Sequence, residues 1–188
     1  MASFLEQIGD NIGEIFSPPL PGDLGTFDQH VDFILGKVTP YGEDLREKNF
    51  WLKKRWQEVR DDEGFHESLL HLFNEGGEYL LIVDGNIVKG TWKQLNDNNS
   101  LILEMGGRSE LFDLRFLNAD YMILAKHGDQ ARKGQRKYFL LVREPLAKGR
   151  DWRTIMEGMF NIWRDSSVSL WGWVSLIIVI ALMVLWLR

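Results

Sequence analysis

The stretch that decides the fold is Ser100-Leu-Ile-Leu-Glu-Met-Gly-Gly-Arg-Ser-Glu-Leu-Phe-Asp-Leu-Arg-Phe-Leu117. Apolar and polar side chains alternate along both of its halves, and a period of two residues is that of a strand with one buried face. Two glycines, Gly106 and Gly107, separate the halves and supply the backbone freedom of a tight turn. The stretch therefore predicts two antiparallel strands, over 99–105 and 109–117.

The same pattern recurs on both sides of this stretch, with turn residues such as Asp84-Gly-Asn86 between the apolar segments. Short strands joined by tight turns favour an antiparallel meander, either closed into a barrel or folded as a sandwich. Closure is favoured because it leaves no long unpaired edge. The eight candidate strands lie at about 50–59, 67–74, 77–84, 87–95, 99–105, 109–117, 120–126 and 136–143.

The alternation also assigns side chains to the two faces of the sheet. One face is predicted to hold the apolar residues of three strands, namely Leu101, Leu103, Phe112, Leu114, Phe116, Tyr138, Leu140 and Val142. The charged residues between them are predicted to face water, namely Glu104, Asp113, Arg115 and Arg143.

Three features follow one another within residues 50–144: Phe73-Asn-Glu-Gly-Gly-Glu-Tyr79, then Gly90-Thr-Trp92, then a series of apolar strands. In these features the segment resembles the bacterial lipocalin-like domain. The resemblance implies an eight-stranded barrel over about 50–145, with Phe73, Tyr79, Gly90 and Trp92 as its motif residues, and a role as a ligand carrier. The bulk of Tyr79 and Trp92 favours a place in the core over a role as a ligand platform.

The segment before the barrel, 1–49, is predicted to be an acidic helical extension. Over 3–16, apolar residues recur about every four positions, which indicates an amphipathic helix. The prolines of 17–22 end it and form a linker, and 26–36 is predicted to be a second short helix capped by Thr26. We expect the first helix to dock on a protein partner or on its own domain through Phe4, Ile8, Ile12, Ile15 and Phe16.

After the barrel, 146–167 is predicted to hold an amphipathic juxtamembrane helix. Its apolar stripe can dock on the barrel, lie at the membrane surface or contact a partner. The stripe consists of Trp152, Ile155, Met156, Met159, Phe160 and Trp163.

Residues 168–187 form a run of 20 residues without a charge. About 20 apolar residues in a helix cross the hydrocarbon core of a bilayer, so this segment is predicted to be a transmembrane helix. Anchoring at the two interfaces is assigned to Trp171, Trp173, Trp186 and Arg188, and close packing with other helices to Gly172, Ser175 and Ala181.

The flanking sequence predicts an orientation for this span. The N-terminus shows no signal-peptide pattern, and four basic residues lie between 148 and 164 while only Arg188 follows the span. The predicted topology is therefore tail-anchored in the cell (inner) membrane, with the N-terminal part in the cytoplasm.

The fold class predicted from these segments is mainly β, an eight-stranded antiparallel meander that is barrel-like. N-terminal amphipathic helices precede it, and a C-terminal transmembrane helix follows it. The four predicted parts are 1–49, 50–145, 146–167 and 168–187.

Composition excludes several kinds of chemistry. The chain has no cysteine, and none of its four histidines has helical spacing to another that suits a metal. No phosphate loop or nucleophile motif is present, and no part is basic enough to bind nucleic acid. We therefore expect no catalytic residues, no metal and no cofactor.

Two functions are considered at this point, and the sequence favours the first. The first is a structural or adaptor subunit of a larger membrane complex, with membrane lipids and either other subunits or copies of itself as partners. The second is a lipocalin-like module that binds a lipid or another apolar ligand, because an eight-stranded barrel is either filled by side chains or holds one small ligand.

Overall fold

The structure is a computed structural model, and it describes residues 19–62, 68–95, 99–128 and 136–166, together with Met183 and Trp186. Within these ranges no helix is long and apolar enough to span a membrane. Met183 and Trp186 are helical and exposed. Three sets of predicted residues lie outside the described residues: the docking residues of 3–16, the packing residues Gly172, Ser175 and Ala181, and the anchors Trp171, Trp173 and Arg188.

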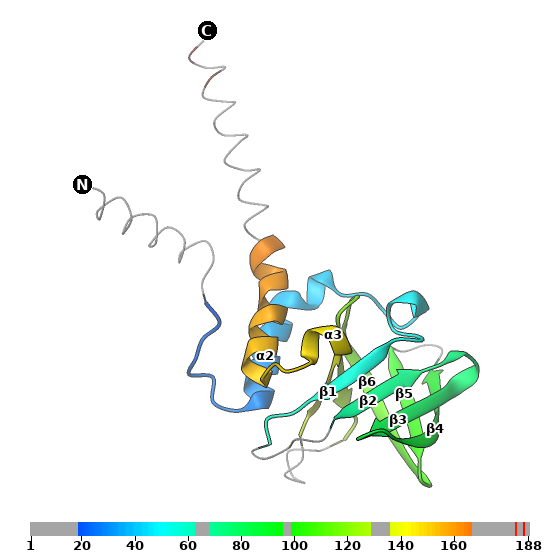
Figure 1. Ribbon diagram of the computed structural model, residues 1–188. Helices are drawn as coiled ribbons and strands as arrows, with labels where there is room; N and C mark the ends of the chain where they lie inside the picture. Colours follow the sequence, from blue (N-terminus) through cyan, green and yellow to red (C-terminus); the bar gives the residue numbers. More distant parts are fainter. Residues whose placement is uncertain are drawn as a thin grey trace.

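Eight antiparallel strands form a closed barrel in sequence order, as predicted (Figure 1). Each strand pairs with the next, and β1 closes the barrel by pairing with β8. The strands are β1 (Arg55–Val59), β2 (Leu69–Phe73), β3 (Glu78–Val83), β4 (Asn86–Leu95), β5 (Ser100–Met105), β6 (Arg108–Leu117), β7 (Tyr121–Lys126) and β8 (Tyr138–Arg143).

One end of the barrel is plugged by the segment before β1, and here the predicted strand 50–59 is wrong over its first half. That segment contains two 3-10 helices, η1 (Thr39–Tyr41) and η2 (Lys48–Phe50). Lys53 then takes a φ of 58°, a left-handed conformation that no strand uses. The chain therefore turns before β1 starts, and Trp51 and Leu45 are fully buried instead of lying in a strand.

Aromatic and aliphatic side chains fill the plugged half of the barrel. The Trp51 ring meets Phe73 and Trp92 edge-on, with centroids 5.4 Å and 4.8 Å away. This core consists of Leu45, Trp51, Trp56, Phe73, Tyr79, Leu101, Leu103, Phe112, Leu117, Met122, Leu124 and Leu141.

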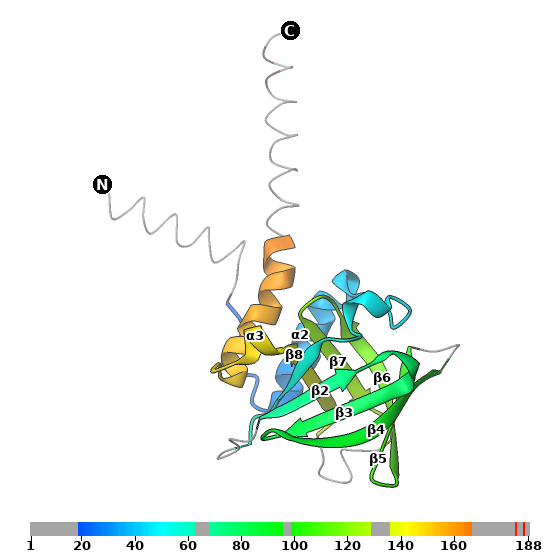
Figure 2. The ribbon, with the colours of Figure 1, turned by 45° about the vertical axis from the view of Figure 1, so that its right-hand side comes forward.

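A second core lies outside the barrel wall, beneath helices gathered on one side (Figure 2). Helix α2 (Phe27–Val38), the turn of helix α3 (Glu144–Ala147) and a helix over 152–166 contribute to it. The predicted single apolar face is therefore wrong in part. Leu101, Leu103 and Phe112 belong to the barrel core, whereas the outer core contains Phe116, Tyr138, Leu140 and Val142.

A shift of register in β6 accounts for the position of Phe116, whereas Tyr138 aligns through Ala125 with Asp113, on the opposite face from Phe112. Leu114 pairs with Leu124 and Phe116 pairs with Ile123, so an extra residue stands between the two pairs. A bulge of this kind reverses the side that later residues face. Phe116 consequently packs outside the barrel, although strict alternation would have placed it with Phe112.

The 152–166 helix uses its apolar stripe within the chain. Ile155, Met156, Met159 and Phe160 are buried in the outer core, and Trp152 packs against Phe27 of α2 with ring centroids 5.8 Å apart. Of the three contacts left open for this stripe, docking on the protein's own barrel is the one observed. The helix predicted at 26–36 is α2, and Thr26 caps it in a box with Gln29.

Candidate functional site

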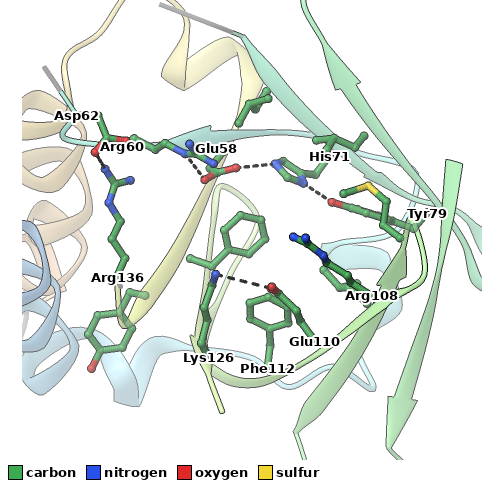
Figure 3. A pocket seen from close by; sticks show the side chains of 16 residues that line it. Glu58, Arg60, Asp62, His71, Tyr79, Arg108, Glu110, Phe112, Lys126 and Arg136 are labelled. Atoms are coloured by element: carbon green, nitrogen blue, oxygen red, sulfur yellow. Dashed lines mark hydrogen bonds and ion pairs between the residues drawn. The ribbon is translucent and has the colours of Figure 1, made fainter. Parts of the chain in front are cut away.

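A cavity of about 500 Å³ occupies the end of the barrel opposite the Trp51 plug (Figure 3). Most of its residues lie towards the end of β1, β5 and β7 and the start of β2, β6 and β8, which is one end of the barrel, and β3 contributes Tyr79 and Leu81. The lining consists of Glu58, Arg60, Asp62, Leu69, His71, Tyr79, Leu81, Leu103, Met105, Arg108, Glu110, Phe112, Lys126, Arg136, Tyr138 and Phe139.

The cavity has an apolar part and a charged part. Leu103 and Phe112 belong to the core that fills the plugged half of the barrel, and Leu81 and Phe139 pack against that core. Charged side chains from β1, β6 and β7 lie around the remainder of the lining. Apolar walls with a few placed polar groups are typical of small-molecule sites, whose volumes are about 300–1,000 Å³.

Three polar side chains in the wall form a hydrogen-bonded chain across β1, β2 and β3. Glu58 Oε2 lies 3.2 Å from His71 Nε2, and His71 Nδ1 lies 2.6 Å from the Tyr79 hydroxyl. With Glu58 ionised, His71 donates from Nε2. In the neutral imidazole, Nδ1 then accepts the Tyr79 O–H.

The pKa shifts of these groups agree with this arrangement. Burial alone would raise the pKa of Glu58, but hydrogen bonds from His71 and Arg60 outweigh it and hold the pKa below its usual value. Burial, together with the nearby Glu58 carboxylate, raises the pKa of Tyr79. Glu58 is therefore ionised and Tyr79 is neutral at pH 7.

Ion pairs neutralise most of the charge in the wall. Arg60 Nε contacts Glu58 Oε1, and Arg136 Nη2 lies 2.6 Å from Asp62 Oδ1. Lys126 Nζ lies 3.7 Å from Glu110 Oε2, which is a loose pair.

The four motif residues take structural positions around the plug. Phe73 is fully buried, and Trp92 donates from Nε1 to the Asn74 carbonyl at 2.8 Å. Gly90 stands where a side chain would collide, because a Cβ there would lie 2.4 Å from the Glu104 carbonyl oxygen. Tyr79 is buried and also lines the cavity, so it packs in the core and at the same time forms part of the cavity wall.

The charged lining was not singled out from the sequence, although one signal for it was present. Arg108, Glu110 and Phe112 alternate along β6, so strict alternation places all three on one face. Within the described ranges, no three histidine or carboxylate side chains come together as a metal site. The buried His71 is instead satisfied by Glu58 and Tyr79.

No protein-family model, curated protein or solved structure matches the chain. The eight-stranded antiparallel barrel is consistent with the lipocalin-like fold that residues 50–144 resemble. Membership of that family stays a prediction.

Most of the polar groups in the wall are held in place by one another. Glu58 and Tyr79 are both engaged by His71, and two of the wall's basic groups are held by close carboxylates. Groups fixed in this way give a closed barrel a rigid lining. Such a lining can select a ligand without the ligand having to order it first.

Proposed function

We propose that the chain is a membrane-tethered binding module whose β-barrel takes an apolar or amphiphilic small molecule. The observation that carries the proposal is the cavity of about 500 Å³, with Leu81, Leu103 and Phe139 on its apolar side. The sequence left open whether side chains fill the whole barrel. They fill the plugged half, and the cavity takes up the other end.

The membrane tether rests on the sequence of 168–187, which has no charge over its length. Carbonate washing tests it: the full chain should stay with vesicles, and a chain that ends at residue 167 should be released. Release of the full chain by the wash would refute the tether. The inner-membrane location and the cytoplasmic placement of the barrel are tested by protease added outside intact cells, which should leave the barrel uncut.

The adaptor role stays a prediction. Three segments are available for contact with partners, namely 3–16, 151–164 and 168–187, and in this structure 151–164 packs against α2 and the barrel wall. The remaining support comes from the acidic helix predicted at 3–16 and from the span. Loss of co-purified partners after deletion of 1–20 would support the adaptor role.

The binding proposal is tested by filling the cavity. The full chain is purified in lipid nanodiscs, and the molecules extracted from it by organic solvent are compared with those from empty nanodiscs. Leu81→Trp adds bulk inside the cavity, while Leu80→Trp is the matched control on the neighbouring residue, which is not part of the lining. We expect an enriched small molecule with the wild type and the control but not with Leu81→Trp. Equal extracts from all three and from empty nanodiscs would refute the proposal.

A further inference from the structure

We infer that the ligand of the cavity is a single-chain amphiphile with a negatively charged head, and that Arg108 binds this head. The inference rests on the proposed binding function and specifies its ligand class. Three observations support the inference: the pairing of charges in the wall, the position of Arg108, and the apolar side of the cavity.

The first step is the charge balance of the lining. Each carboxylate of the lining already has a basic partner. Glu58 contacts Arg60, Asp62 contacts Arg136, and Glu110 contacts Lys126; Arg136 also pairs with Asp61, which is not part of the lining. The described lining has four Arg and Lys side chains against three carboxylates, so one cation is left over.

The leftover cation is Arg108. Among the residues that the structure describes, no carboxylate lies within ion-pair distance of it. Arg108 opens β6 directly after the Gly106-Gly107 turn, opposite Met105 of β5. Figure 3 shows its guanidinium inside the ring of lining side chains, between Tyr79 and Glu110.

The second step is the chemistry that Arg108 favours. A guanidinium presents a planar fork of donors that matches a carboxylate or a phosphate in two parallel hydrogen bonds. A cationic head would be repelled there by the positive charge of the Arg108 guanidinium itself. Lys126 and Glu110 form only a loose pair, at 3.7 Å, so the Lys126 ammonium is a second positively charged donor in the lining.

The third step is the apolar part of the ligand. A head held at Arg108 places its attached chain beside Leu81, Leu103 and Phe139, which line the cavity and belong to or pack against the barrel core. Burial of each methylene contributes about 0.8 kcal/mol. An alkyl chain with an anionic end therefore satisfies both parts of the cavity at once.

The experiment compares ligands that share a chain of eight carbons and differ in the head. Octanoate, octyl phosphate, octanol and octyltrimethylammonium are titrated into the full chain in nanodiscs of zwitterionic lipid, and binding is measured by calorimetry after subtraction of empty nanodiscs. The two anions separate a carboxylate head from a phosphate head. The variants are Arg108→Gln, which removes the charge, and Lys93→Gln, a control at an exposed position on β4 outside the lining.

We expect at least one anion to bind about tenfold more tightly than octanol and the trimethylammonium ligand, because only the anion forms a charge-assisted hydrogen-bonded pair with Arg108. Arg108→Gln should remove this preference and leave the affinity for octanol unchanged, and Lys93→Gln should change neither. Equal binding of anionic and neutral ligands, or an anion preference that survives Arg108→Gln, would overturn the inference while the binding function stands. If none of the four ligands binds, both the inference and the proposed function fail.

Discussion

Gly90 of β4 lies directly opposite Tyr79 of β3, and a Cβ on Gly90 would come within 3.0 Å of Tyr79 Cδ1. The same Cβ would lie 2.4 Å from the carbonyl oxygen of Glu104 on β5. Trp92 is two residues further along the same face of β4 and covers Trp51 in the plug. The Gly-x-Trp pattern is therefore explained by packing: the glycine makes room for the tyrosine ring, and the tryptophan closes the core.

Gly90→Ala is expected to destabilise the protein by about 1–3 kcal/mol, because the added methyl overpacks a site bounded by backbone. The matched control is Gly36→Ala in α2, where nothing lies within 4 Å of the new Cβ. Alanine favours a helix over glycine, so the control should stabilise by about 0.5–1 kcal/mol. Urea unfolding followed by tryptophan fluorescence measures both. Equal effects of the two substitutions would contradict the packing argument.

Trp51→Ala is expected to cost about 3–5 kcal/mol, the usual range for truncating a large buried aromatic side chain. Trp51 is fully buried, and its Nε1 donates to the Leu45 carbonyl at 3.2 Å. The substitution therefore also leaves the Leu45 carbonyl without this hydrogen bond. Phe50→Ala, one residue earlier and only partly buried, should cost clearly less. The two unfolding curves decide this, and a larger effect at Phe50 would show that Trp51 is not the centre of the plug.

The strands could be predicted from the sequence because turn residues punctuate them. Asp84-Gly-Asn86 and Gly106-Gly107 separate apolar runs so clearly that seven of the eight predicted strands agree with the structure to within two residues at each end. The exception is the start of 50–59, where Trp51 looks like a strand residue but serves the plug. Its role depends on the left-handed turn at Lys53, which the sequence pattern does not signal.

The division of the core and the cavity could not be predicted in this way. Every residue from Tyr121 to Ala125 is buried, because β7 has the barrel core on one side and the helices on the other. A strand that is buried on both faces is apolar at successive positions, so its sequence does not alternate between apolar and polar residues. The pairing of Glu110 with Lys126 joins β6 to β7, and the pairing of Asp62 with Arg136 joins segments far apart in the sequence, so the leftover charge on Arg108 emerges only in three dimensions.

Asp32→Asn is expected to loosen α2 from the barrel with little effect on overall stability. Asp32 accepts a hydrogen bond from the Tyr138 hydroxyl and pairs with Lys137 Nζ at 2.8 Å, and the carboxylate is half exposed. A pair exposed to this extent contributes about 0.2–1 kcal/mol. Hydrogen exchange of the α2 amides should therefore become faster, while exchange in β3 and β4 stays unchanged. Uniform acceleration over the whole barrel would contradict this local role.

Glu58→Gln is expected to change how stability depends on pH. Hydrogen bonds from His71 and Arg60 hold the pKa of Glu58 below its usual value of 4.5 despite burial. The folded state therefore favours the ionised form, so its contribution is fully present above about pH 4.5 and is lost as the pH falls through the folded pKa. Below that pH the wild type and Glu58→Gln should approach each other in stability.

At pH 7 the substitution is expected to cost about 1–3 kcal/mol, because His71 and Arg60 lose a charged acceptor in the wall of the cavity. Thermal unfolding of the full chain in nanodiscs, at pH 7 and at pH 3, measures both effects. Glu104→Gln, at an exposed position on β5, is the control and should follow the wild type at both values. If Glu58→Gln is as stable as the wild type at pH 7, then His71 and Tyr79 hold the wall together without the carboxylate.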